Sequence, residues 1–241
     1  MIPKIVHYCW FGGAKKPKKV LKCIKNWKDK LPEYDFIEWN ESNFPFGDIQ
    51  YTADAYREKK YAFVSDVARL YALKNYGGIY FDTDIEVCRD FAHILDTNLV
   101  VSYESTSRIM TGFFAAEKNN IYIDMLLEKY ATLSFYDREG KYNLTPNTVY
   151  FTDLLSNFGI SYDSVGSCIN GIAVYDYHTF GCYNADLSVY EKTDETYIIH
   201  HCAASWMPKR VKYEMILKRI AAKVLGKNAY QKLKVACKKN N

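Results

Sequence analysis

The hydrophobic pattern of the first 39 residues predicts a strand, a helix and a second strand. Residues 5–11 form a β-rich apolar run that two glycines close. Residues 17–30 place apolar side chains at a helical spacing with lysines opposite, and residues 34–39 alternate as a strand does. This order of elements is typical of an α/β fold with a parallel sheet.

The rest of the chain continues to alternate between helical and strand patterns. Residues 53–76 suit a largely buried helix, which Gly77 and Gly78 should end, and a short apolar strand over 79–81 should follow. The other predicted elements are a strand at 99–103, helices at 121–133 and 149–157, short strands and loops over 160–190, and a late strand at 197–201.

A change in charge near residue 208 indicates where the domain ends. Residues 209–241 hold eleven basic residues and one acid, a net charge of +10, so residues 1–208 carry −6 and the whole chain +4. We predict one domain over 1–207 and a basic amphipathic helical tail over 208–241. Such a tail either binds an anionic membrane surface or packs on the domain with its lysines in water. Nucleic acid is not an expected partner, because nothing else in the chain matches a nucleic-acid-binding fold.

The composition favours a cytoplasmic protein. Seven cysteines form no C-x-x-C pair, and their odd number fits reduced thiols. The first strand begins almost at Met1, so we expect no leader peptide, and no apolar run has the length of a membrane span. The 22 tyrosines suit contact with a sugar or nucleoside, and equally suit ordinary core and surface positions.

Two carboxylates, Asp82 and Asp84, follow the apolar strand directly. Charges at the end of a buried strand are costly unless a cation meets them. An extended backbone would point both side chains the same way, so both could face one Mg²⁺ or Mn²⁺ bound jointly with substrate phosphates. The alternative is a capped turn without a metal.

Three more residues are expected near these carboxylates. Asp66 and Arg69 are three positions apart on the predicted helix, so one face presents both, either to a sugar or to each other as an ion pair. Tyr80 alternates with Asp82 and Asp84 along the strand and should lie on their face.

Three blocks of sequence resemble glycosyltransferase family 32. They are the opening run 2–12, the string from Ser65 through Gly77 and Gly78 to Asp84, and the late block 200–206. The family includes bacterial capsular-polysaccharide transferases and yeast initiating mannosyltransferases, and clostridial glucosylating toxins share a related core. The resemblance implies a GT-A fold, Rossmann-like with a mostly parallel sheet, a nucleotide-sugar donor, and transfer with retention of anomeric configuration.

The resemblance also implies roles for individual residues. Asp82 and Asp84 would hold the metal on the donor diphosphate, and Asp66, Arg69 and Tyr80 would contact the donor sugar, with Asp66, Arg69 and Asp84 as the catalytic group. The residues of the late block that would complete the metal and diphosphate site are His200, His201, Ser205 and Trp206.

Some of these assignments stay open in the sequence. Adjacent residues of a strand face opposite ways, so only one histidine can reach the metal, with His200 preferred to His201. Trp10 ends the first strand and either binds the nucleobase or belongs to the core. Asn147 lies in a short loop that resembles a donor-binding loop of the family and that also fits an ordinary turn.

Together these observations predict a metal-dependent, retaining glycosyltransferase. It would move a sugar from a nucleotide-diphosphate donor, with a UDP-sugar favoured, to a hydroxyl of a glycan or lipid-linked oligosaccharide. Surface-polysaccharide synthesis at the inner face of the cell membrane is the expected setting. The alternatives are a metal-dependent nucleotide-sugar hydrolase, a non-catalytic sugar- or nucleotide-binding protein, and a membrane- or partner-binding scaffold.

Overall fold

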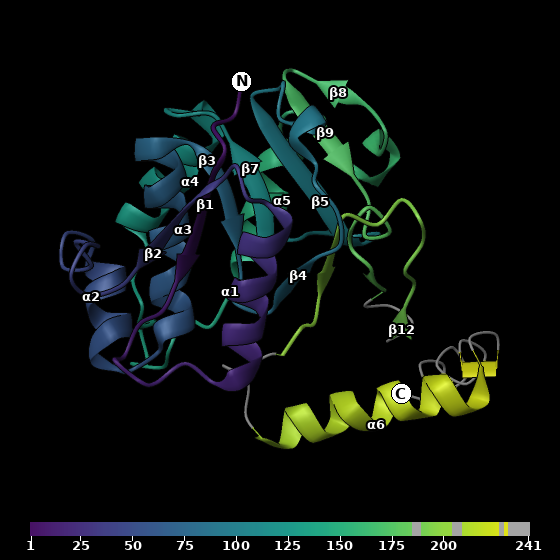
Figure 1. The fold of residues 1–241 in the computed structure, drawn as a ribbon. Coiled ribbons are helices and arrows are strands. Elements are labelled where there is room, and N and C mark those ends of the chain that lie inside the picture. Colours follow the sequence, from purple (N-terminus) through teal and green to yellow (C-terminus); the bar gives the residue numbers. More distant parts are fainter. Residues whose placement is uncertain (185–188, 204–208, 227–228, 231–241) are drawn as a thin grey trace.

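A mixed eight-stranded sheet forms the centre of the protein (Figure 1). Its strands are β1 (Ile5–Cys9), β2 (Asp35–Trp39), β3 (Gly78–Phe81), β5 (Leu99–Ser105), β6 (Arg108–Ile109), β7 (Phe113–Ala116), β8 (Cys168–Ile169) and β9 (Ile172–Tyr175). They lie in the order β2-β1-β3-β7-β5-β9-β8, with β6 beside β5. Five strands run in one direction, and β6, β7 and β8 run against them. The sheet is therefore mostly parallel in direction, with an antiparallel strand in its middle.

Two smaller sheets complete the strand structure. The first is formed by β10 (Phe180–Gly181), β13 (Ile198–His200) and β4 (Ile85–Val87), in that order, and the second is a pair formed by β11 (Tyr183–Asn184) and β12 (Val189–Tyr190). The computed structural model describes residues 1–184, 189–203, 209–226 and 229–230.

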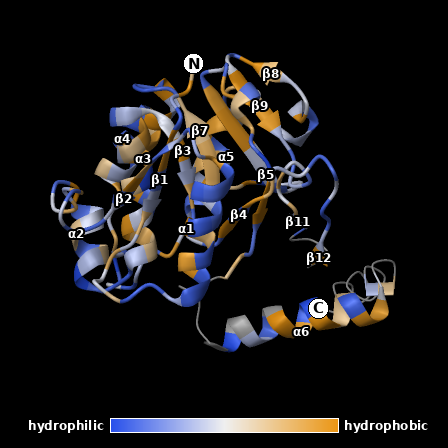
Figure 2. Ribbon diagram, in the orientation of Figure 1, coloured by the Kyte–Doolittle hydropathy of each residue, from blue (hydrophilic) through white to orange (hydrophobic). Residues whose placement is uncertain are grey.

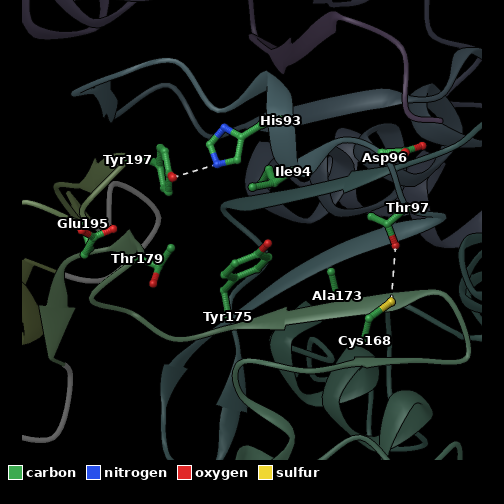
Figure 3. Close-up of a pocket in the computed structure, with 10 residues that line it drawn as sticks. All are labelled: His93, Ile94, Asp96, Thr97, Cys168, Ala173, Tyr175, Thr179, Glu195 and Tyr197. Atoms are coloured by element: carbon green, nitrogen blue, oxygen red, sulfur yellow. Dashed lines mark hydrogen bonds between the residues drawn. The ribbon is translucent and has the colours of Figure 1, made fainter.

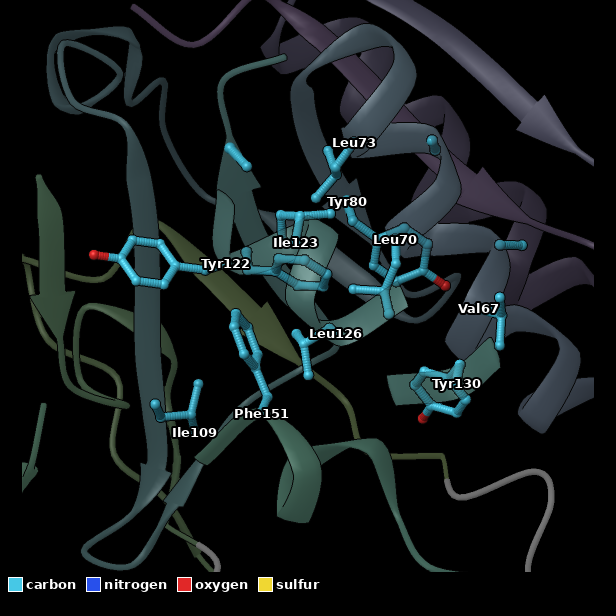
Figure 4. Close-up of a cluster of buried hydrophobic side chains, with 14 of the residues drawn as sticks. Val67, Leu70, Leu73, Tyr80, Ile109, Tyr122, Ile123, Leu126, Tyr130 and Phe151 are labelled. Carbon is cyan, nitrogen blue, oxygen red and sulfur yellow. The ribbon is translucent and has the colours of Figure 1, made fainter. Parts of the chain in front are cut away.

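Helices cover both faces of the central sheet (Figure 1). They are α1 (Lys18–Lys30), α2 (Gln50–Arg57), α3 (Tyr61–Tyr76), α4 (Ile121–Thr132), α5 (Asn147–Ser156), and the short turns η1 (Ala92–Ile94) and η2 (Tyr162–Ser164). One core cluster packs α2 to α5 on one face, and Figure 4 shows its centre. A second cluster packs α1 and the three-stranded sheet on the other face. Side chains of β3 alternate between the two, because Ile79 and Phe81 belong to the second cluster and Tyr80 to the first.

The predicted helix over 53–76 is wrong at one point, because the structure divides it into α2 and α3. Lys59 between them has φ of 56°, a left-handed conformation that ends a helix. The run 57–60 is Arg-Glu-Lys-Lys, which offers no apolar side chain to continue the buried face of α2. The two helices thus need not be collinear to bury their apolar faces.

The strands β6 and β7 lie where the sequence analysis did not predict any strand. All four residues of β7 are buried. A strand buried on both faces has no alternation of polar and apolar residues, so pattern alone does not mark it.

The last helix, α6 (Lys209–Leu225), lies in the predicted tail and runs along one side of the protein beyond the β11–β12 pair (Figure 1). The predicted boundary near residue 207 falls outside the described residues. No described helix is both long and apolar enough to cross a bilayer.

Candidate metal and donor site

Asp82 and Asp84 lie in a tight turn between β3 and β4. The extended backbone predicted here is wrong, since the backbone N–H of Ile85 donates to the carbonyl of Asp82 at 3.1 Å and closes a turn. The two carboxylates nevertheless converge. Ligand atoms of Asp82, Asp84 and His200 all lie within 4.8 Å of one another. We expected the two carboxylates to converge because of alternation along a strand. They converge instead because of the turn that follows the strand.

The two late histidines point to different places. On β13, His200 places its Nε2 atom 3.2 Å from Asp84 Oδ1 and 3.7 Å from Asp82 Oδ2. His201 pairs instead with Glu86, with 3.0 Å between Nε2 and Oε2. The structure therefore brings His200, and not His201, to the carboxylates.

Arg69 connects the buried helix α3 to the carboxylate turn. Its Nη2 atom lies 3.0 Å from Asp66 Oδ1 and 3.5 Å from Asp82 Oδ1. Its other donors reach the backbone carbonyls of Ser65 and Thr111 at 3.1 and 2.5 Å. The Asp66–Arg69 ion pair, which the sequence left open as the alternative to a sugar contact, is therefore present, and the same guanidinium also contacts the Asp82 carboxylate.

Tyr80 also contacts the Asp82 carboxylate. Its hydroxyl donates to Asp82 Oδ1 at 3.0 Å. The Arg69 guanidinium carbon stacks on its ring, 4.5 Å from the ring centroid. The residue is almost completely buried. Tyr80 thus lies on the face of Asp82, as the alternation predicted, and its hydroxyl is occupied by that carboxylate.

Gly112 packs directly against His200 and Asp82, and the sequence analysis missed it. A β-carbon on residue 112 would lie 2.7 Å from His200 Cε1 and 2.9 Å from Asp82 Oδ2. Its carbonyl also accepts the backbone N–H of Asp82 at 2.8 Å. The sequence signal was a lone glycine beside an apolar run, which often marks a close approach.

Glu104 is the second residue that the sequence analysis missed. It lies on β5 where the pairing with β6 changes register between Tyr103 and Ser105, and such bulges re-aim side chains. The pKa of Glu104 is raised to about 7, chiefly by burial and also by Asp82, while His200 and Arg108 oppose the shift. A carboxyl group therefore lies within electrostatic reach of the predicted metal ligands.

Burial and mutual attraction set the protonation of the site. Burial alone would raise the pKa of Asp84, but the His200 imidazole and the backbone N–H of Ala203 outweigh it and lower the pKa to about 2. Burial would lower the pKa of His200, but the neighbouring Cys202 and the Asp84 carboxylate, which lies against the imidazole, raise it well above its usual value. Without a cation, a protonated His200 thus offsets part of the negative charge of Asp82 and Asp84.

Two carboxylates and one imidazole fit a divalent cation. Oxygen ligands suit Mg²⁺ and Mn²⁺, and the imidazole nitrogen favours Mn²⁺ of the two. Three ligands from the protein leave coordination positions for the oxygens of a substrate diphosphate.

Of the other predicted site residues, Asn147 contacts Asp66, and Trp10 contacts the loop that follows it. Asn147 is buried at the start of α5, where its Nδ2 donates to the carbonyl of Asp66 at 3.1 Å, and its Oδ1 has no hydrogen-bond partner among the described residues. Trp10 is half-buried and not a core residue, and its indole N–H donates to the carbonyl of Ala14 at 2.6 Å. Ser205 and Trp206 lie outside the described residues.

A cavity of about 490 Å³ opens elsewhere, between η1, β9 and the start of β13 (Figure 3). Its lining residues include His93, Tyr175 and Tyr197, and none of the predicted site residues. The carboxylate cluster is thus separate from this cavity.

Comparison with known proteins finds a family that part of the chain resembles. Residues 17–101 match the family described as "Glycosyltransferase sugar-binding region containing DXD motif". The matched segment contains Asp66, Arg69, Asp82 and Asp84. Residues 17–101 are thus similar to the sugar-binding region of DXD-motif glycosyltransferases.

Two curated relatives are also named as glycosyltransferases. The chain is 26% identical over 226 residues to an uncharacterized glycosyltransferase, L373, of Acanthamoeba polyphaga mimivirus, covering 86% of this chain and 85% of the relative. It is 25% identical over 142 residues to inositol phosphoceramide mannosyltransferase 3 of Schizosaccharomyces pombe, covering 56% of this chain. The match spans only 38% of that relative.

A solved structure, PaToxG glycosyltransferase, shares the fold. It superimposes with a TM-score of 0.51 at 22% identity, covering 65% of this chain and 69% of that one. The α/β, GT-A fold expected from the sequence is thereby confirmed, and so is the resemblance to the DXD glycosyltransferases.

Proposed function

We propose that this protein is a metal-dependent, retaining glycosyltransferase that uses a nucleotide-diphosphate sugar. The observation that carries the proposal is the convergence of Asp82, Asp84 and His200 inside a region that matches the DXD sugar-binding family. Such a site binds a diphosphate through a shared divalent cation.

Asp82, Asp84 and His200 would hold Mn²⁺ or Mg²⁺ against the donor diphosphate. The cation neutralises negative charge that develops on the diphosphate as the bond to the sugar breaks. Because Arg69 and Tyr80 fix Asp82 on two sides, the carboxylate is oriented before the donor arrives.

The donor sugar would lie beside α3 and the start of α5. In this proposal Asp66 accepts hydrogen bonds from sugar hydroxyls, and Arg69 positions Asp66 and Asp82 instead of contacting the sugar. The unpartnered Oδ1 of Asn147 is a further acceptor for a hydroxyl. Trp10, at the carboxyl edge of β1, would flank the nucleobase.

The acceptor hydroxyl would approach on the face that the diphosphate leaves, which retains the anomeric configuration without a covalent intermediate. Glu104, near the cluster, would accept a hydrogen bond from a substrate hydroxyl. A UDP-sugar is the favoured donor. Mannose is a second candidate sugar, because the yeast relative is named a mannosyltransferase.

The acceptor would be a glycan or a lipid-linked glycan at the inner face of a membrane, in surface-polysaccharide synthesis. The yeast relative supports a lipid-bearing acceptor, since inositol phosphoceramide, which its name carries, is a lipid. A capsular setting is the specific form of this proposal.

A turnover assay tests the proposal against its alternatives. The full chain would be incubated with UDP-glucose, UDP-galactose, their N-acetyl forms and GDP-mannose, with Mn²⁺ or with EDTA, and with or without a panel of glycans. We expect nucleotide release that needs Mn²⁺ and rises with one acceptor, and an NMR spectrum of the product that shows the donor's anomeric configuration.

Other outcomes would favour other functions. Equal release of free sugar with and without every acceptor would favour a hydrolase. Metal-linked donor binding without any turnover would favour a non-catalytic binding protein. An inverted product anomer would contradict the retaining mechanism alone.

A further inference from the structure

Helix α6 exposes a continuous row of large apolar side chains. Figure 2 shows apolar residues along this helix, which runs beside the protein. The exposed fractions are 68% for Tyr213, 50% for Ile216, 65% for Leu217, 53% for Ile220 and 77% for Val224. We call these five residues the α6 stripe.

Helical geometry places the α6 stripe on one face. At 100° per residue its members fall within an arc of about 100°. Ala222 lies opposite the middle of this arc and is 2% exposed. The helix therefore has one face toward the protein and another toward solvent.

The contacts of Arg219 show which face of α6 lies against the protein. Its Nη2 donates to the carbonyl of Cys202 at 3.3 Å, and its guanidinium lies over the rings of Tyr183 and Tyr190 at 4.7 and 5.7 Å. These contacts attach α6 to the β11–β12 pair on the side away from the stripe. The described part of the chain leaves the stripe in solvent.

Cations border the stripe on both sides. By helical geometry Arg210 lies about 20° beyond one edge and Lys223 about 20° beyond the other. The residues of α6 carry six basic side chains and one acid, a net charge of +5. An apolar strip edged by cations is the pattern of a helix that lies in the headgroup region of an anionic bilayer.

We propose that the α6 stripe binds the surface of an anionic lipid membrane. The apolar side chains would enter the boundary between headgroups and acyl chains, and the bordering cations would meet lipid phosphates. A second copy of this chain fits less well, because pairing two stripes would bring like charges together. The proposal rests on α6 alone and does not depend on the proposed transferase activity.

Vesicle co-sedimentation of the full chain tests the proposal. The vesicles would be phosphatidylcholine alone or phosphatidylcholine with phosphatidylglycerol. The test variant is Leu217→Glu, within the stripe. Its matched control is Leu225→Glu, which makes the same change at an exposed leucine off the stripe. Circular dichroism and thermal unfolding would confirm that both variants fold.

We expect the wild type to bind anionic and not neutral vesicles, with binding that weakens as salt is added. Leu217→Glu should reduce binding at least about tenfold, since it replaces an inserted apolar side chain with a charge that lipid phosphates repel. Leu225→Glu should stay within about twofold of wild type, and Lys223→Ala should lose about fivefold as one interfacial cation is removed.

Three results would overturn the proposal. One is wild-type protein that stays in the supernatant with anionic vesicles. Another is equal loss of binding in Leu217→Glu and Leu225→Glu. The third is a wild-type dimer in analytical ultracentrifugation that Leu217→Glu dissociates, without vesicle binding, which would assign the stripe to a second copy.

Discussion

The Arg69 guanidinium lies 3.5 Å from the Asp82 carboxylate, so a residue in the middle of a buried helix orients the first carboxylate of the DXD motif. The same Nη2 atom lies 3.0 Å from Asp66. One side chain thus couples the helix face that the sequence singled out to the candidate metal site, and this coupling leads to the first prediction.

Arg69→Lys should weaken metal-dependent donor binding roughly a hundredfold while leaving the protein folded. Lysine keeps the charge, but it cannot span Asp66, Asp82 and two backbone carbonyls as a planar guanidinium does. Calorimetric titration of Mn²⁺ and then donor would measure both steps. Unchanged affinity for both would show that Arg69 does not orient the site.

Gly112→Ala should lower Mn²⁺ affinity by about ten- to a hundredfold. Its new methyl group would overlap His200 and Asp82, so the ligands would have to separate. Gly47→Ala is the matched control, because a β-carbon there meets no atom within 4 Å. Equal Mn²⁺ affinity in the two variants would contradict the close approach seen at Gly112.

His200→Ala and His201→Ala form a pair of adjacent substitutions with opposite expectations. Only His200 reaches Asp82 and Asp84, so its removal should weaken Mn²⁺ binding roughly a hundredfold, and removal of His201 less than about threefold. Wild-type Mn²⁺ affinity should rise with pH, because the metal displaces the proton that a raised pKa keeps on His200. Titrations of Mn²⁺ at several pH values would measure both effects.

Glu104→Gln should alter the pH dependence of stability in the metal-free protein. Burial raises the pKa of Glu104 from 4.5 to about 7, so the folded state favours the protonated form. The contribution of Glu104 to stability is thus fully present below pH 4.5 and is lost as the pH rises to about 7. Relative to wild type, Glu104→Gln should therefore gain on the order of 1 kcal/mol between pH 5 and pH 8.

Urea unfolding in EDTA at those two pH values would measure the gain. A difference between variant and wild type that is the same at both pH values would contradict the raised pKa.

The local elements could be read from the sequence wherever the pattern was regular. The strand β1, helix α1 and strand β2 follow from alternation and helical spacing within 39 residues. Long-range pairing could not be read in the same way. The antiparallel strand β7, inserted between β3 and β5, depends on contacts between residues far apart in the chain.

The residues of the candidate site also divide into those that the local sequence indicates and those that depend on long-range contacts. The sequence singled out five candidates because they lie within one short stretch whose spacing and family resemblance carry information: Asp66, Arg69, Tyr80, Asp82 and Asp84. Glu104 and Gly112 were missed because neither has a motif, and only the folded chain brings them near His200. The choice between His200 and His201 also required the path of β13 beside β4.

The central claim is that Asp82, Asp84 and His200 form a metal site that holds a nucleotide-sugar donor. It is tested most directly by thermal-shift binding of UDP- and GDP-sugars, with Mn²⁺ or EDTA, to wild type, Asp84→Asn and the exposed control Asp29→Asn. We predict that one donor stabilises wild type and Asp29→Asn only when Mn²⁺ is present, and does not stabilise Asp84→Asn. Stabilisation that is equal in EDTA or in Asp84→Asn, or no stabilisation by any donor in a folded protein, would contradict the claim.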